Sequence, residues 1–399
     1  MSIDHPAELD EDFDYFANDP PDLVDRLHRL RESRPAAWVR AWGQPALMLT
    51  SYELVDAAFR DEATFPSAAF YGTTVTDVLG RNIQCMEGEE HRRNRALVSP
   101  YFRAKNVKEV VPPLLEPVAH ELIDRFEDRG ETDLVASFTK LYPIKIILRL
   151  LGLPIESEDD VARWAIGMMD IQNNHAAAVQ CSKDFVAFVD PILQRRRVEP
   201  ETDLLSELAT VEIEGERLSD EEIMNFLLLL FPAGADTTFL GLGSTLFGLL
   251  THPDQLDFVR SSLDTECRWA AEEAIRWVPP VSLQPRRNPK DVVWRGVPIP
   301  AGATLIFATL AANRDPAAYD DPDRFDVRRR PKATLTFGRG PHFCLGAHLA
   351  RAEMEVAVRV LLERLPRLRL VAGDGEDARI AAGIVPVFRG PNRLPVRFD

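Results

Sequence analysis

The stretch that most restricts the fold runs from Phe226 to Leu250, where twenty-five residues carry one charge, Asp236. An apolar run of this length can cross a bilayer, which takes about 20 residues. Its middle nevertheless holds a proline, an acid and two threonines, in the sequence PAGADTT. The run is therefore either a membrane span with a functional interior or the core helix of a soluble protein built around something.

Composition favours the soluble protein. Of the 399 residues, 45% are hydrophobic and 28% are charged, which is ordinary for a globular chain. No second apolar run rivals the first, no basic cluster flanks it, and the acidic N-terminus lacks signal-peptide features. A net charge of −16 argues against nucleic-acid binding, and four scattered cysteines suit a reducing compartment. We expect a cytoplasmic protein without a membrane span.

Helical periodicity dominates the rest of the chain, so the predicted fold class is mainly α with small β-sheets. The expected helices are Leu23–Ser33, Ser51–Arg60, Gly88–Phe102, Val107–Arg129 and Asp159–Asn173. The expected strands are Ala46–Thr50, Val292–Trp294, Thr304–Phe307 and the C-terminal RLPVRF. Because no repeat or flexible linker divides the chain, we predict one domain over 1–399, with β-rich portions near 37–50, 290–310 and 367–399.

The apolar run has its own start signal, because Ser219 and Glu222 have the spacing of a capping box. The predicted helix runs from about Asp220 to Leu250, roughly 45 Å, and Pro232 weakens it halfway by removing a backbone donor. One face of it is built mostly from small residues: Leu230, Ala233, Gly234, Thr237 and Gly241. Such a face fits a partner helix, a flat ligand or tight core packing.

A second signal is FGRGPHFCLGAHLARAE, in which glycines and a proline surround Cys344. An apolar stripe at helical spacing follows, so Cys344 is expected near a helix N-terminus, where the dipole favours a thiolate. Three interpretations are open. His342, Cys344 and His348 are close enough in sequence to bind zinc; Cys344 is a catalytic nucleophile; or its thiolate binds haem iron.

Four motifs in order resemble a known family. FGRGPHFCLG resembles the cysteine-ligand loop of the cytochrome P450 haem-thiolate monooxygenases, and AGADTT resembles the oxygen-activating segment of their long central helix. EAIR and PDRF match the family's Glu-x-x-Arg helix and the segment that precedes its meander. The resemblance covers essentially the whole chain and is strongest for bacterial soluble members. It implies the P450 fold, with a long central helix over haem b (iron protoporphyrin IX).

The resemblance also implies roles for individual residues. Cys344 would be the metal ligand, and the residues expected to bind the cofactor are His91, Arg95, Ala233, Arg286, Phe337, His342, Cys344 and Gly346. Thr237 would donate protons for oxygen activation, with Asp236 relaying them from water. The alternative is that Thr237 bonds a helix carbonyl and Asp236 forms a buried ion pair. Glu273, Arg276 and Arg324 would form a structural network.

By the same resemblance, the substrate pocket would contain Phe70, Tyr71, Val78, Phe239, Val281, Leu283 and Val385. This apolar lining suits a hydrophobic small molecule such as a terpenoid, steroid, fatty acid or polyketide. With no room in the chain for a flavin or iron–sulfur domain, we expect electrons from a ferredoxin and its reductase. The basic run Arg328–Lys332, with Arg92 and Arg93, is the expected docking patch, and a solvated loop is its alternative.

The expected reaction inserts one oxygen atom from O2 into the substrate. A peroxide-using or non-hydroxylating enzyme on the same scaffold is one alternative, and a haem-binding sensor without turnover is another. The pair Asp236 and Thr237 favours the monooxygenase, because neither alternative needs protons delivered to dioxygen.

Overall fold

A computed structural model describes residues 6, 8–110, 112–154, 158–213, 215–371, 379–383 and 386–398. Its α-helices are α1 (Leu23–Ser33), α2 (Tyr52–Arg60), α3 (Ser67–Thr74), α4 (Thr76–Leu79), α5 (Gly88–Phe102), α6 (Ala104–Val110), α7 (Pro112–Asp124), α8 (Leu141–Leu150), α9 (Glu158–Met169), α10 (His175–Val198), α11 (Leu204–Thr210), α12 (Asp220–Thr251), α13 (Pro253–Arg260), α14 (Leu263–Trp277), α15 (Thr309–Ala312) and α16 (Ala347–Arg364). Short helical segments are η1 (Ile83–Cys85), η2 (Glu127–Arg129), the π-helix η3 (Val135–Thr139), η5 (Val327–Arg329) and η6 (Gly340–His342).

The strands are short: β1 (Ala36–Ala41), β2 (Gln44–Leu49), β3 (Glu131–Asp133), β4 (Glu212–Ile213), β5 (Glu216–Arg217), β6 (Gln284–Arg287), β7 (Val292–Trp294), β8 (Val297–Ile299), β9 (Thr304–Phe307), β10 (Arg369–Leu370), β11 (Ile380–Ala382), β12 (Arg389–Pro391) and β13 (Pro395–Arg397). The fold class predicted from the sequence is confirmed, and the predicted β-rich portions all contain strands. That the whole chain forms one domain stays a prediction.

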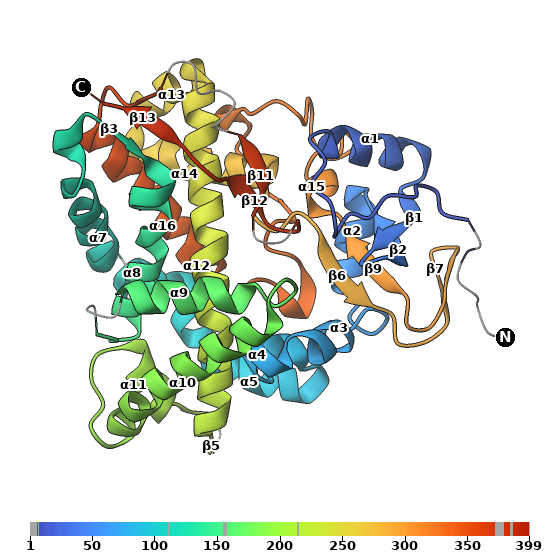
Figure 1. Cartoon of the computed structure of the whole chain (residues 1–399), viewed down its shortest axis with the longest axis horizontal. Helices are drawn as coiled ribbons and strands as arrows, with labels where there is room; N and C mark the ends of the chain where they lie inside the picture. Colours follow the sequence, from blue (N-terminus) through green and yellow to red (C-terminus); the bar gives the residue numbers. More distant parts are fainter. Residues whose placement is uncertain are drawn as a thin grey trace.

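The helix α12 crosses the helical part of the molecule (Figure 1). Its predicted start is confirmed: the Ser219 hydroxyl accepts from the Glu222 N–H at 3.1 Å, and the Glu222 carboxylate accepts from the Ser219 N–H at 2.8 Å. By length and composition α12 is able to span a membrane, but 67% of its most apolar window is buried inside the protein. It packs against α8, α9, α14 and α16. The apolar run therefore lies in the protein core.

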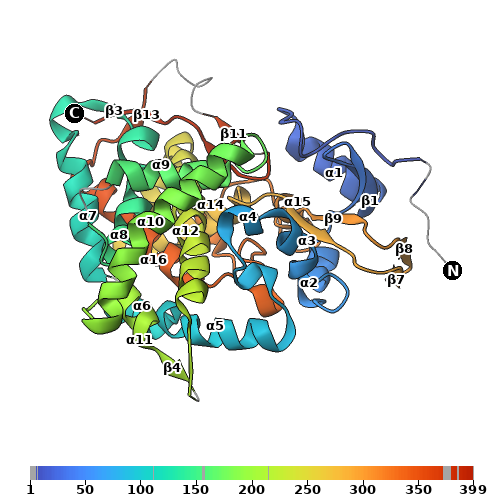
Figure 2. The same cartoon turned by 60° about the horizontal axis from the view of Figure 1, so that its bottom comes forward.

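The largest sheet has the strand order β1-β2-β9-β6 and lies beside the helical part (Figure 1). β2 runs parallel to β9, and the other two pairings are antiparallel. Side chains alternate between two apolar clusters, so that Leu47 and Leu305 face one cluster while Met48 and Ile306 face the other. Figure 2 shows α3 and α4 between α12 and this sheet, and α3 packs on β6.

A buried ion pair fixes the end of α14. Glu273 and Arg276 are both fully buried, and the Arg276 guanidinium donates to the Glu273 carboxylate through Nε and Nη2, each at 2.8 Å. Arg276 also donates to the carbonyls of Asn313, Pro322 and Arg324, at 2.8 to 3.2 Å. The three carbonyls lie 37 to 48 positions further along the chain, so one cation holds these segments against α14.

The prediction that the Arg324 side chain belongs to this network is wrong. The side chain that joins Glu273 and Arg276 is Arg329, whose Nε donates to Glu273 Oε1 at 3.1 Å. The Arg324 side chain is exposed, and this residue contributes only its backbone carbonyl. The turn of η5 after the PDRF segment brings Arg329 inward, and sequence spacing alone does not show that turn.

This network continues to the segment before Cys344. Asn313, whose carbonyl binds Arg276, accepts from the Leu335 N–H at 2.8 Å through its side chain. The same side chain donates to Thr336 Oγ1 at 2.9 Å, and Thr336 donates to the carbonyl of Ile275 at 2.6 Å. The position of the chain that enters the cysteine loop is thereby set by α14.

Several predicted boundaries differ from the structure. The expected helix Val107–Arg129 is divided into α6, α7 and η2, because the prolines at 112 and 113 lack the N–H groups that a continuous helix needs. The expected helix Asp159–Asn173 ends at Met169 and is followed by turns. β1 and β6 were not predicted as strands, because their sequences lack a clear polar–apolar alternation.

We expect Glu273→Ala to lower the free energy of unfolding by about 3–5 kcal/mol, because it leaves the buried Arg276 cation without its carboxylate. The measurement is urea unfolding followed by circular dichroism. A matched control is Glu363→Ala, which removes an exposed carboxylate on α16 paired with Arg359 and should cost less than about 1 kcal/mol. Equal losses in the two variants would show that the buried pair does not stabilise the fold.

Candidate functional site

The loop before α16 is a tight turn that its glycines make possible. Gly338 and Gly340 have φ of +67° and +69°, which side chains rarely adopt. A Cβ at Gly340 would lie 2.7 Å from the carbonyl oxygen of Phe59. The Phe343 N–H donates to the Gly340 carbonyl at 3.1 Å, and the Cys344 N–H donates to the Phe337 carbonyl at 2.9 Å. These contacts hold Cys344 three residues before α16 begins.

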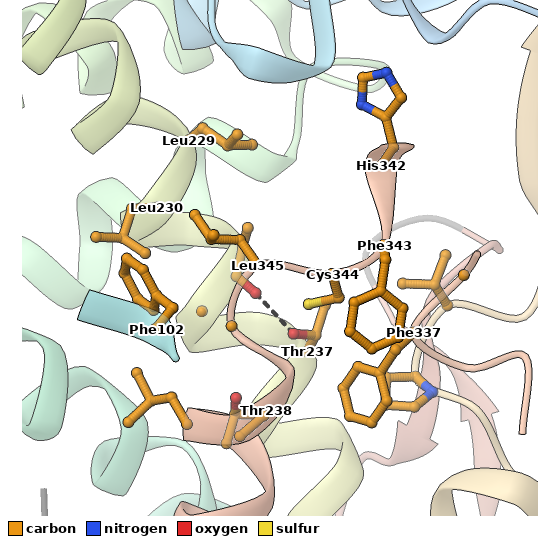
Figure 3. A pocket seen from close by; sticks show the side chains of 18 of the residues that line it. Phe102, Leu229, Leu230, Thr237, Thr238, Phe337, His342, Phe343, Cys344 and Leu345 are labelled. Carbon is orange, nitrogen blue, oxygen red and sulfur yellow. Dashed lines mark hydrogen bonds between the residues drawn. The ribbon is translucent and has the colours of Figure 1, made fainter. Parts of the chain in front are cut away.

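A cavity of about 260 Å³ separates this loop from α12 (Figure 3). Five residues of α12 that line it are the face of mostly small residues in the sequence, Leu230, Ala233, Gly234, Thr237 and Gly241. The loop contributes Phe337, Phe343, Cys344, Leu345 and Gly346. The small face of α12 thus borders a cavity opposite a cysteine, as a flat ligand would require.

The Cys344 side chain is exposed to this cavity although it lies deep in the protein. Burial raises the pKa of its thiol. The Gly346 N–H and the charges of Arg95 and Arg351 favour the thiolate but do not outweigh burial. The favourable effect of the helix N-terminus therefore stays a prediction, and a bound cation would favour the thiolate further.

Cationic side chains surround the same cavity. Arg95, Arg286 and His342 line it, and Arg95 donates to the carbonyl of Phe343, next to Cys344. The guanidinium of Arg286 lies 5.3 Å from the ring centroid of Tyr71 and 5.6 Å from that of Phe307. Four of the five polar or ligating side chains expected at the cofactor therefore line one cavity, together with Ala233, Phe337 and Gly346.

The fifth, His91, lies behind His342, and the centroids of the two rings are 4.2 Å apart. Burial lowers the pKa of His91 to about 4, and its buried Nε2 has no hydrogen-bond partner within the described chain. His342 Nε2 lies 3.0 Å from the carboxylate of Glu62. Burial raises the pKa of Glu62, but the hydrogen bond and charge of His342, the Ser67 N–H and the charge of Arg286 together hold this pKa below its usual value.

These residues fit a haem. An apolar cavity is bordered by an accessible sulfur on one wall, and three cationic or polar side chains are available for acidic groups. The orphaned Nε2 of His91 is a further donor or acceptor that a ligand would satisfy. By contrast, no three His, Cys, Asp or Glu side chains converge on a metal site in the described ranges. The zinc interpretation of His342, Cys344 and His348 therefore has no ligand set there.

Thr237 and Asp236 lie side by side on α12, and only Thr237 lines the cavity. The Thr237 hydroxyl donates to the Ala233 carbonyl at 2.7 Å, shown by the dashed line in Figure 3. The alternative considered from the sequence had two halves, a bond from Thr237 to a helix carbonyl and a buried ion pair of Asp236, and the first half is present. The other half is not found, because no cation of the described residues pairs with Asp236 within 4 Å. Burial raises the pKa of Asp236 to about 7, against an opposing effect of Lys140.

A second cavity, of about 520 Å³, shares Tyr71, Ala233, Thr237 and Val281 with the first. Of the residues expected to bind substrate, Phe70, Tyr71, Val281 and Leu283 line it. Two others do not: Val78 is 1% exposed in the helical core, and Phe239 turns to the other side of α12, with its ring 5.7 Å from Lys140 Nζ. Val385 lies outside the described residues.

Sequence reasoning missed two acids at the site, Glu62 and Glu353. Glu353 on α16 lines the first cavity, and its Oε2 has no partner in the described part of the chain. Burial raises the pKa of Glu353 well above its usual range, which favours the neutral carboxyl. A signal was present, since Glu353 interrupts the apolar face of α16 between Leu349 and Val360. Glu62 gives no such signal in a polar loop.

The basic patch expected to bind a redox partner is largely neutralised within the chain. Arg329 pairs with Glu273, Arg330 with Glu266, Arg92 with Glu89, and Arg93 with Glu216 and Glu222. The guanidinium of Arg328 lies 3.9 Å from the ring centroid of Phe258. Four of these five arginines therefore have acidic partners within the chain, whereas Arg328 is exposed and has no ion-pair partner among the described residues. That this region is a docking patch stays a prediction.

Comparisons with known proteins agree with this geometry. A family model described as Cytochrome P450 matches residues 159–367. The chain is 36% identical to the 6-deoxyerythronolide B hydroxylase of Saccharopolyspora erythraea, over 93% of this chain and 94% of that protein. It is 35% identical to the mycinamicin IV hydroxylase/epoxidase of Micromonospora griseorubida, over 94% of this chain and 95% of the relative.

Solved structures give the same result. The cytochrome P450 PksS of the Bacillus subtilis bacillaene polyketide synthase superposes with a TM-score of 0.87 at 28% identity, covering 94% of this chain and 97% of that one. Near-complete coverage in both directions means that the likeness includes the cysteine loop, α12 and the sheet together. This chain belongs to the cytochrome P450 family of haem-thiolate monooxygenases.

Proposed function

We propose that this protein inserts one oxygen atom from O2 into a hydrophobic small molecule, with Cys344 as the residue that would ligate the haem iron and with Asp236 and Thr237 moving protons. The observation that carries the proposal is the single cavity bordered by the Cys344 sulfur and by Thr237. Haem b, when bound, supplies the iron that activates dioxygen. Cys344 would ligate that iron, while Arg95, Arg286, His342 and His91 would bind the acidic groups.

The proton path we propose runs along α12. Thr237 Oγ1 holds a proton that it now donates to the Ala233 carbonyl, and a rotation of its side chain would direct this proton into the cavity. Asp236 would replace the proton, since a pKa of about 7 lets its carboxyl both give and accept a proton near neutral pH. Lys140, exposed at the surface beside Phe239, opposes the effect of burial and lowers the pKa of Asp236.

Relatives named for 6-deoxyerythronolide B, mycinamicin IV and vitamin D3 support a hydrophobic substrate for this chain as well. The apolar lining of the second cavity, with Phe70, Val281 and Leu283, agrees with that class. We propose that a separate ferredoxin and its reductase supply the electrons, and that the protein works in the cytoplasm, as befits its bacterial relatives.

We expect the protein, reduced with dithionite and exposed to carbon monoxide, to show a Soret band strongly red-shifted from that of a histidine-ligated haem. The thiolate of Cys344 is the physical reason. Cys344→Ser should remove the shifted band, whereas Cys181→Ser, on α10 away from both cavities, should keep it. An unshifted band in the unaltered protein would refute ligation by Cys344.

Thr237→Ala should divert reducing equivalents from product to hydrogen peroxide, because a proton donor at the cavity is lost. Turnover would be measured with a surrogate ferredoxin and reductase, on any compound that shifts the Soret band. The matched control is Thr245→Ala, which removes a hydroxyl that also donates to a carbonyl of α12, at 2.8 Å, away from the cavities. Equal coupling in both variants would leave a sensor or a peroxide-using enzyme as the better explanation.

Asp236→Asn should stabilise the fold in a pH-dependent manner. The folded-state pKa of Asp236 is about 7, above its ordinary value of 3.8, so stability is full below the ordinary value and is lost as pH rises through 7. At pH 8 the neutral amide should therefore raise the free energy of unfolding by about 4 kcal/mol, and the gain should vanish near pH 4. Urea unfolding between pH 4 and pH 8 measures this difference. The control is Asp257→Asn, which alters an exposed carboxylate. A gain in the free energy of unfolding that is equal at every pH would contradict the raised pKa of Asp236.

A further inference from the structure

The strand β6 carries two adjacent arginines that face different cavities. Successive side chains of a strand point to opposite sides, and here Arg286 lines the first cavity whereas Arg287 lines the second. Pro285, two residues before Arg287, faces the second cavity with it. The proposed function uses Arg286 for the cofactor and leaves Arg287 without a role.

Arg287 is the one charged side chain among the described residues that line the second cavity. Its surroundings are mostly apolar, with aromatic residues from four parts of the chain: Phe16, Trp42, Phe70, Tyr71 and Phe388. No carboxylate of the described residues forms an ion pair with it. Arg287 is half-buried and its contact with Thr73 is exposed, so water can hydrate the cation in the free protein and an anionic ligand can reach it from the cavity.

The guanidinium is also held in place, with donors to spare. Its Nη1 donates to Thr73 Oγ1 at 3.0 Å, and its centre lies 5.6 Å from the ring centroid of Phe70. Both partners belong to α3, so one helix fixes the orientation of the group. Within the described chain Nε and Nη2 have no acceptor. These two N–H groups form the edge of a guanidinium that binds a carboxylate through two parallel hydrogen bonds.

The second cavity leads to the site of oxidation. Thr237 and Ala233 of α12 line both cavities, as do Tyr71, Val281 and Gln284. A molecule that fills the second cavity therefore extends from Arg287 on the sheet side to Thr237 on the helix side. Its apolar body would contact Leu283 and Phe70 between these ends.

We propose that Arg287 is a specificity-determining residue that binds a carboxylate on the substrate. The substrate class is then an elongated hydrophobic carboxylic acid, with its acid group at β6 and its reacting carbon toward Thr237. This inference rests on the proposed function and narrows its substrate. It also excludes a class, because a substrate with an amine at the same end would meet the like charge of Arg287.

Three probes of equal chain length separate charge from hydrophobicity: dodecanoic acid, dodecan-1-ol and dodecylamine. Binding to the haem-loaded protein would be measured by calorimetry at pH 7.4, where the acid is anionic and the amine cationic. We expect the acid to bind about tenfold more tightly than the alcohol, as one charge-assisted contact would give. The amine should bind more weakly than either.

Arg287→Gln should abolish the preference for the acid while leaving the alcohol unaffected, and Arg287→Glu should reverse the order in favour of the amine. The control is Arg217→Gln, which alters an exposed arginine paired with Glu212 and should keep the preference of the unaltered protein. Equal binding of acid and alcohol to the unaltered protein, or an acid preference that survives Arg287→Glu, would overturn the inference.

The carbon monoxide spectrum of the same preparation separates the two proposals. A shifted Soret band with no acid preference overturns the role of Arg287 and leaves the monooxygenase intact. An acid preference that depends on Arg287 supports the binding site even where the spectrum contradicts ligation by Cys344.

Discussion

The fully buried ion pair between Glu273 and Arg276 is the interaction on which the arrangement of the site depends. A guanidinium without solvent must satisfy its donors inside the protein, and Arg276 does so with one carboxylate and three carbonyls from distant segments. The geometry of that cation therefore decides where those segments lie. Through Asn313 and Thr336 the constraint reaches the entry to the cysteine loop.

The central helix α12 combines two requirements that conflict. An apolar sequence lets it pass through the core between α8, α14 and α16. The proposed proton transfer would require polar groups halfway along, and burying the Asp236 carboxyl there raises its pKa to about 7. Burial of this carboxyl is energetically costly, but the raised pKa is what the proposed proton transfer would need. A carboxyl with its ordinary pKa would hold almost no proton at neutral pH.

Features that depend on residues close together in sequence could be predicted, whereas features that depend on residues far apart in sequence could not. The capping box at Ser219, the extent of α12 and the glycine-rich turn at Cys344 depend on residues a few positions apart, and all three are present as predicted. The failures involve partners distant in sequence. Arg329 replaces Arg324 because of a local turn, and Phe239 turns to Lys140, which lies almost a hundred positions away. Glu62 meets His342 only through the fold.

The helices and the sheet contribute different residues to the site. The buried network of α14 holds the segment that enters the cysteine loop, and α12 packs against α14, so the groups that would bind the cofactor and move protons have little freedom. β6 adds one arginine to that region and one to the second cavity, because its side chains alternate. A change at Arg287 therefore alters the second cavity and leaves Arg286 in the first. Under the proposed role of Arg287, substrate choice would then vary while the groups proposed for oxygen chemistry stay the same.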